Sequence, residues 1–306
     1  MNLDFSLLHS LLKIKSPSGD EIQMKNFILD YLDKNRSILK GWEVMEGPHI
    51  QDCLILNKGR PNVAFISHMD TVGFTARYEN QLVPIGSPDV ENGADIVGED
   101  ELGLIECKVK LNQNGRLFHN FNRPVIRGTS LVFKPYISES SNYIYASYLD
   151  NRIGIFLSLQ LLNIIENGML VFSCWEEIGG GSIPYLAKII YEDYRINQVI
   201  IADVTWITDG ILPGNGVAIS LRDRSIPRRL YIEKIISIAH KKSIPYQLEV
   251  EGEGSSDGGE IQRTPYPINW GFIGPPVENT HTPREKVHKK DIISTFKIYQ
   301  ALAQNL

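Results

Sequence analysis

Hydrophobic and polar positions follow helical spacing in some parts of this chain and strand spacing in others. The first helical pattern lies near the start, where apolar residues recur at Met24, Phe27, Ile28, Tyr31 and Leu32. This spacing predicts an amphipathic helix. Ser18 and Glu21 precede it with the spacing of a capping box, so we expect the helix to begin there.

From residue 170 onward, the two patterns alternate. Apolar strand-like runs cover residues 170–174, 198–202 and 244–250, and helical runs lie between them at 183–190 and 232–239. Such alternation predicts an α/β sandwich with a largely parallel central sheet flanked by helices.

Residues 77–136 have a different pattern. Short runs are interrupted by Gly, Asn, Asp and Pro, and residues 104–111 and 130–133 resemble strands. We interpret this segment as a small β-rich insertion, which divides one larger domain into residues 1–76 and 137–306.

An acidic pair follows the predicted strand at 170–174. The chain continues as Trp175, Glu176 and Glu177, followed by a glycine run. A hydrolytic metal site needs one carboxylate to hold a cation and another to move a proton. Two acidic neighbours are more often a solvated turn, so the interpretation depends on other residues.

His68 and Asp70 end another apolar run. Residues two apart on a strand share a face, so Asp70 could accept a hydrogen bond from one ring nitrogen of His68 while the other nitrogen binds a metal. The alternative is a structural histidine with a local carboxylate partner.

Three more candidate ligands are spread along the chain. Asp150 precedes a long apolar segment, where an acidic residue is ordinarily a helix N-cap. Asp203 closes the apolar strand at 199–203, and His281 lies in a polar turn, where a lone histidine is usually just exposed.

The candidate ligands together are His68, Asp150, Glu177, Asp203 and His281. Three of them follow apolar strands, and open α/β sheets build their sites at the carboxyl ends of strands. Imidazoles combined with carboxylates suit zinc, or another borderline ion such as cobalt or manganese.

Three motifs resemble the tetrahedral and glutamyl aminopeptidase family of dimetal metallopeptidases: His-Met-Asp-x-x-Gly at 68–73, Leu-Asp-Asn-Arg at 149–152 and Glu-Glu-Ile-Gly at 176–179. The resemblance implies two divalent ions per chain. Asp150 would bridge them, His68 and Asp203 would complete one side, and Glu177 and His281 the other. It also implies Glu176 as general base, Asp70 as its assistant at the site, and a cis peptide bond after Asp150.

The resemblance further implies an aminopeptidase that acts on short peptides with a free N-terminus. A related dimetal carboxypeptidase or N-acyl amino-acid deacylase shares the motifs, and a scaffold protein that has lost the chemistry is a third interpretation. Because family members assemble through an insertion at this position, we expect a homo-oligomer, with dimer and dodecamer both open.

Some residues depart from the family pattern. Glu278-Asn279-Thr280 replaces the usual context of the late histidine, so His288 is an alternative last ligand. Asp257 either supports the substrate pocket or belongs to a plain turn. Residues 222–224, Arg-Asp-Arg, either line the pocket for the first side chain or form a solvated turn. The preferred N-terminal residue and the physiological metal stay open.

Composition adds limits on partners and location. A net charge of −5 gives no electrostatic reason to expect nucleic acid or an anionic membrane as a partner. The start of the chain has no signal-peptide pattern and no segment is long enough to span a bilayer, so we expect cytoplasmic residence. The three cysteines, Cys53, Cys107 and Cys174, are widely spaced and predict no disulfide framework.

Overall fold

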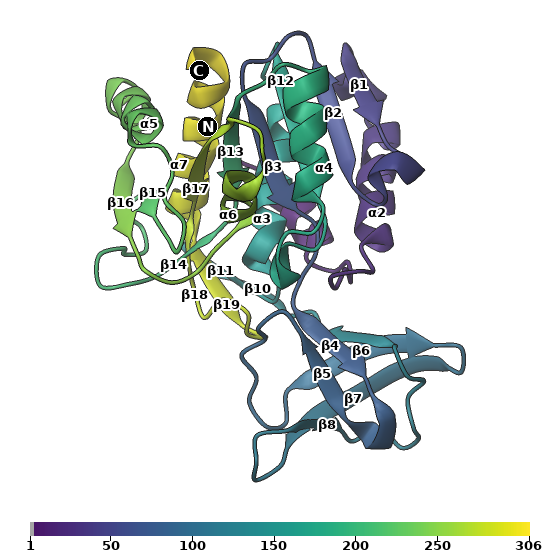
Figure 1. The fold of residues 1–306 in the computed structure, drawn as a ribbon. Helices are drawn as coiled ribbons and strands as arrows, with labels where there is room; N and C mark the ends of the chain where they lie inside the picture. Colours follow the sequence, from purple (N-terminus) through teal and green to yellow (C-terminus); the bar gives the residue numbers. More distant parts are fainter. Residues whose placement is uncertain (1–2) are drawn as a thin grey trace.

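The computed structural model describes residues 3–306 and contains a large mixed sheet (Figure 1). Its eight strands lie in the order β1-β2-β12-β3-β13-β17-β15-β16. Their bounds are β1 Trp42–Met45, β2 Leu54–Lys58, β12 Gly168–Ser173, β3 Ala64–His68, β13 Gln198–Ala202, β17 Asn269–Gly274, β15 Val217–Arg222 and β16 Tyr246–Val250.

The centre of this sheet is parallel. Strands β12, β3, β13 and β17 all run in the same direction, and Ser173 at the end of β12 pairs with His68 at the end of β3. Antiparallel pairs occur further out, between β1, β2 and β12 and between β17 and β15. Every residue of β3 and β12 is buried, as expected for strands covered on both faces. The predicted α/β fold is confirmed.

Two groups of helices pack with the sheet (Figure 1). In one group, α1 contacts α3, α3 contacts α7 and α7 contacts α5; in the other, α4 contacts α6. The helices are α1 Ser6–Leu11, α2 Ile22–Lys34, α3 Leu149–Leu161, α4 Ile183–Lys188, α5 Arg229–Lys241, α6 Asp257–Arg263 and α7 Lys289–Asn305. The helical run predicted at 183–190 is split, because a short π-helix, Ile189–Asp193, follows α4.

The start of α2 corrects one prediction. The helix begins at Ile22, but no side chain caps it, so the expected capping box is absent. Glu21 instead accepts hydrogen bonds from the backbone amides of Gly19 (3.0 Å) and Trp175 (3.1 Å). The Ser18 hydroxyl donates to Asp70. Residues with the spacing of a local cap therefore make long-range contacts next to the acidic pair.

A second sheet is formed by residues 73–133 and projects away from the first (Figure 1). Its six strands have the order β5-β4-β9-β6-β7-β8. The bounds are β4 Gly73–Ala76, β5 Leu82–Ile85, β6 Asp95–Asp100, β7 Gly103–Leu111, β8 Leu117–His119 and β9 Ser130–Phe133. It has a small apolar core of its own around Phe74 and Phe133. Because β4 belongs to this sheet, the sheet starts four residues before the insertion expected at 77–136.

A smaller five-stranded sheet completes the fold, in the order β10-β11-β19-β18-β14. The bounds are β10 Ile137–Glu139, β11 Tyr143–Ala146, β14 Thr205–Trp206, β18 Pro276–Glu278 and β19 Glu285–His288. Across residues 3–306, helices are too short or too polar to cross a membrane.

Candidate metal centre

His68 lies at the carboxyl end of β3 and is buried. Its Nε2 atom is 3.2 Å from Asp150 Oδ1 and 3.5 Å from Asp203 Oδ1. Asp203 directly follows β13, the neighbour of β3 in the sheet. The parallel strands thus bring together polar side chains that are far apart in the sequence.

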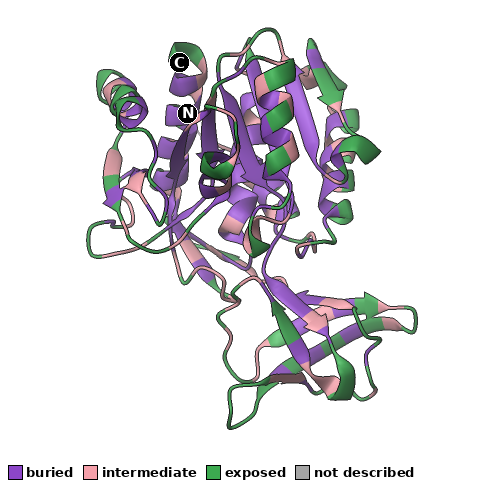
Figure 2. Cartoon of the chain, in the orientation of Figure 1, coloured by how far each residue is buried: buried purple, intermediate pink, exposed green. Residues whose placement is uncertain are grey.

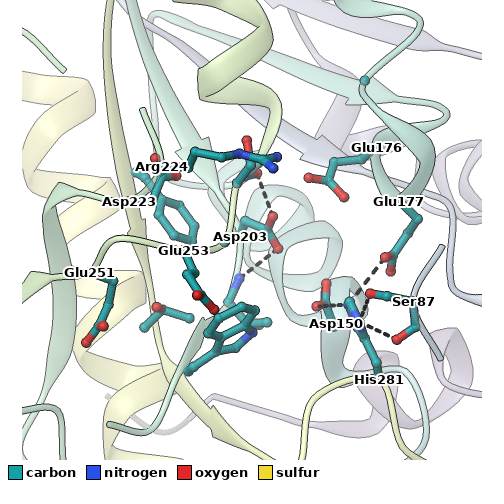
Figure 3. A pocket seen from close by; sticks show the side chains of 18 of the residues that line it. Ser87, Asp150, Glu176, Glu177, Asp203, Asp223, Arg224, Glu251, Glu253 and His281 are labelled. Carbon is teal, nitrogen blue, oxygen red and sulfur yellow. Dashed lines mark hydrogen bonds and ion pairs between the residues drawn. The ribbon is translucent and has the colours of Figure 1, made fainter. Parts of the chain in front are cut away.

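His281 faces the other side of Asp150. Its Nε2 atom lies 3.4 Å from Asp150 Oδ2 and 3.3 Å from Glu177 Oε2. Figure 3 shows Asp150, Glu177 and His281 together at one end of a cleft, with Asp203 beside them. The two carboxylate oxygens of Asp150 therefore each face a different imidazole.

Glu177 lies in a short 3₁₀ turn, Glu176–Ile178, that follows β12. One carboxylate oxygen from each of Asp150 and Glu177 and a ring nitrogen of His68 lie within 4.8 Å of one another. Glu176, the predicted base, points to the same region, with Oε2 3.9 Å from His68 Nε2.

Asp70 acts mainly on the acidic pair. Its carboxylate accepts hydrogen bonds from the backbone amides of Glu176 and Glu177, each at 3.1 Å. His68 Nδ1 lies 3.2 Å from the backbone oxygen of Asp70 and 3.5 Å from its carboxylate. The predicted orientation of His68 by residue 70 is present, but the nearer acceptor is the carbonyl rather than the side chain.

Two further residues position the candidate ligands and were not predicted for this role. Glu285 is 1% exposed, and its two oxygens accept from the backbone amides of His281 (2.8 Å) and Asp150 (3.1 Å). Ser87 lies in the second sheet's segment, and its hydroxyl is 3.0 Å from His281 Nδ1. Only the tertiary fold brings Ser87 to a residue 194 positions away.

The backbone around the candidate ligands is strained. Tyr148, Trp175 and His281 have φ angles of 68°, 62° and 65°, in the left-handed region that non-glycine residues rarely adopt. Such conformations persist where surrounding contacts over-determine them, and they cluster at functional sites. Asp150 lies inside the first turn of α3 with non-helical angles, so it is not an N-cap. The expected cis peptide bond joins it to Asn151.

The residues whose roles the sequence left open are His288, Asp257 and residues 222–224. His288 is the N-cap of α7, where its Nδ1 accepts from the Lys290 amide, and it is not in the cluster. Asp257 is buried and accepts from the Ser173 hydroxyl at 2.6 Å, so it is more than a plain turn residue. Asp223 and Arg224 line the cleft.

Burial and neighbouring charges shift the pKa values of several residues in the cluster. Burial lowers the pKa of His281, but its hydrogen bond to Asp150 and the charges of Glu177 and Asp150 outweigh burial and raise this pKa to about 10. Burial and the negative charge of Asp150 raise the pKa of Glu177 to about 8. Burial also raises the pKa of Glu176 well above its usual range.

These residues fit a divalent cation. The buried Glu177 Oε1 atom has no hydrogen-bond partner within residues 3–306, although buried carboxylate oxygens are normally satisfied. The nitrogen and carboxylate donors present are those that zinc and similar ions bind. A cation among them would offset the repulsion between the carboxylates.

The fold and this cluster define a class, the metal-dependent peptidases with an α/β sheet. The family profile described as M42 glutamyl aminopeptidase matches residues 122–298. Because that match covers more than half of the chain, the chain belongs to this family. The predicted resemblance and the predicted activity, that of a metal-dependent aminopeptidase, are confirmed.

Solved structures show the same fold. Aminopeptidase APDkam598 of Desulfurococcus kamchatkensis has a TM-score of 0.82 at 21% identity, covering 99% of this chain and 94% of that one. The TET aminopeptidase of a marine-sediment Thaumarchaeota archaeon has a TM-score of 0.85 at 19% identity, covering 99% and 96%. The Pyrococcus horikoshii TET1 peptidase, which can assemble into a tetrahedron or an octahedral shell, has a TM-score of 0.81 at 20% identity, covering 98% of both chains.

Proposed function

We propose that this aminopeptidase holds two divalent ions, with Asp150 as the ligand that they share. His68 and Asp203 bind one ion, and Glu177 and His281 bind the other. The observation that supports this most strongly is the placement of the two Asp150 oxygens, 3.2 Å from one imidazole and 3.4 Å from the other. Zinc suits these donors best, and cobalt or manganese could replace it.

Glu176 is the general base in this proposal. When bound, such ions lower the pKa of a water molecule and polarise the scissile carbonyl. The Glu176 carboxylate takes a proton from the attacking water and delivers it to the leaving amine. Asp70 fixes the backbone of Glu176 and Glu177 through two amide hydrogen bonds, which keeps the base and a metal ligand in register.

Short peptides with a free N-terminus are the proposed substrates. A cleft of about 300 Å³ leads to Asp150, Glu176, Glu177, Asp203 and His281. We further propose cytoplasmic residence and a homo-oligomer assembled through the second sheet; the assembly of the Pyrococcus horikoshii relative supports this by analogy.

The test uses metal-stripped protein. Zinc, cobalt or manganese is added back, and release of the first residue is measured from unblocked and N-acetylated versions of the same aminoacyl substrates. We expect metal-dependent release from the unblocked set only. Faster cleavage of acetylated substrates would favour a deacylase, and metal-independent release would contradict the proposed centre.

A further inference from the structure

The cleft continues from the metal centre to a wall of acidic side chains. Five carboxylates outside the proposed catalytic set line it: Asp223, Glu249, Glu251, Glu253 and Glu260. Among residues 3–306, the only lysine or arginine in this lining is Arg224. Figure 3 shows Glu251, Glu253 and Asp223 on the side of the cleft opposite Glu177 and His281.

Three of these residues lie at alternate positions along one segment of the chain and line the same cleft. Glu249 lies in β16, and Glu251 and Glu253 follow at alternate positions. Alternate residues of an extended chain point to one side. Leu248 and Val250, on either side of Glu249, are exposed. The acidic wall, defined here as Glu249, Glu251 and Glu253, therefore begins in a strand that ends at Val250 and continues into the loop that follows.

The acidic wall has no balancing cation of its own. Glu260 forms an ion pair with Arg263, and Asp223 accepts from the Ser225 amide. In the described part of the chain, by contrast, no lysine or arginine forms an ion pair with Glu249, Glu251 or Glu253.

Glu249 is the least exposed member of the acidic wall. It is only 2% exposed, and the Thr205 hydroxyl donates to one of its oxygens. Burial raises the pKa of Glu249, and the negative charges of Glu251 and Asp223 raise it further. No lysine or arginine of residues 3–306 balances this buried carboxyl group, so a cationic ligand beside it would favour its ionised form.

Apolar side chains lie in the same cleft. Val204, Trp206 and Phe272 line it together with the acidic wall. A lysine or arginine side chain combines an apolar stem with a charged end, and such stems pack on apolar surfaces while the charge reaches a polar partner. The cleft offers both kinds of surface.

We propose that the cleft selects peptides whose N-terminal residue is lysine or arginine, and that the acidic wall determines this specificity. The inference rests on the proposed metal centre, which fixes where the first residue of the substrate lies. A glutamyl side chain, which the family's description suggests, would meet charges of its own sign. The exposed guanidinium of Arg224 does not balance three carboxylates.

The first test compares kcat/KM of the zinc-loaded protein for lysyl, arginyl, leucyl and glutamyl coumarylamides. We expect lysyl and arginyl substrates to exceed the glutamyl one by at least ~10-fold, since a charge mismatch in a partly buried pocket discriminates strongly. The double variant Glu251→Gln/Glu253→Gln should lower the lysyl-to-glutamyl ratio by about tenfold or more.

A matched control removes the same charge elsewhere. Glu101 lies in the second sheet's segment and Glu166 precedes β12, and both are exposed outside the cleft. The variant Glu101→Gln/Glu166→Gln should keep the ratio within about twofold of the parent, as expected for screened surface charges. A parent that prefers the glutamyl substrate, or an unchanged ratio in the cleft variant, would overturn the specificity proposal and leave metal-dependent hydrolysis intact.

Binding gives a readout that does not depend on turnover. Zinc-loaded Glu176→Gln protein is titrated calorimetrically with Lys-Ala and with Glu-Ala dipeptides. We expect Lys-Ala to bind at least ~10-fold more tightly. Equal affinities would overturn the proposal, whereas this preference combined with no hydrolysis by the parent protein would count against the metal centre instead.

Discussion

The two larger sheets of this chain bury their residues in different ways (Figure 2). In the eight-stranded sheet, β3 and β12 are buried along their whole length. In the six-stranded sheet, β7 alternates between buried and exposed residues. In β3 and β12, the candidate site residues thus lie at or just beyond the strand ends, whereas the polar residues of β7 are spread along an open face.

Charge pairing differs in the same way. In the second sheet, Asp100 pairs with Arg123 at 2.7 Å, and Lys108 pairs with Asp95 at 2.7 Å. At the candidate metal centre, the ion pairs within residues 3–306 join carboxylates to histidines only. Paired charges stabilise a fold, whereas carboxylates that lack a lysine or arginine are available to bind a cation. Substitutions at the candidate metal centre should therefore change activity or metal affinity, whereas substitutions in the second sheet should change stability.

The largest effect is expected at Glu176. Glu176→Gln keeps the shape of the side chain but cannot accept the proton of water, so kcat should fall by about 10²–10⁴-fold while metal content is kept. Steady-state kinetics measures kcat, and mass spectrometry measures the metal content. Activity close to that of the parent would show that another group is the base.

The variant Glu285→Gln tests whether residues that position the candidate ligands also determine metal affinity. In Glu285→Gln the amide cannot accept from both the His281 and Asp150 backbones, so metal affinity should fall about 10–100-fold. Competition with a chelator gives this affinity. Glu278→Gln, on the neighbouring strand β18, is the control and should retain the parent affinity.

Ser87→Ala tests a side-chain contact between the second sheet's segment and a candidate ligand, His281. Loss of the hydroxyl near His281 Nδ1 should weaken metal binding by less than Glu285→Gln, by a few-fold to about tenfold, because the backbone oxygen of Ser87 still lies 3.2 Å from that nitrogen. A loss equal to that of Glu285→Gln would remove the distinction between the two regions.

The smallest effect on activity is expected at Asp100. The Arg123 guanidinium holds the pKa of Asp100 at about 2, below its usual value, so this contribution to stability is present above about pH 4 and is lost as the pH falls toward 2. Asp100→Asn should lower the urea midpoint at pH 7 and leave kcat near that of the parent. The difference between the two proteins should shrink at pH 3, and a constant difference would contradict the account.

Residues that end strands were predictable from the sequence. His68, Glu177 and Asp203 follow apolar runs, and parallel strands bring such ends together. Glu285 and Ser87 were not predictable as positioning residues, because their contacts join segments 135 and 194 positions apart. The acidic wall does have a sequence pattern, carboxylates at alternate positions, but the strand that displays it ends at Val250 and the pattern continues into a loop.

The expected capping role of Glu21 was wrong because its contacts also depend on distant parts of the chain. A capping box and a long-range acceptor have the same local sequence, and the choice depends on whether other amides lie closer. Here the Trp175 amide, 154 positions away, lies within 3.1 Å of the Glu21 carboxylate. Local spacing cannot contain that information.

Anomalous diffraction at the zinc edge, from crystals of the zinc-loaded protein, tests the central claim most directly. We predict two peaks per chain on either side of the Asp150 carboxylate, one beside His68 and Asp203 and one beside Glu177 and His281. A single peak, or peaks away from Asp150, would contradict the proposed centre.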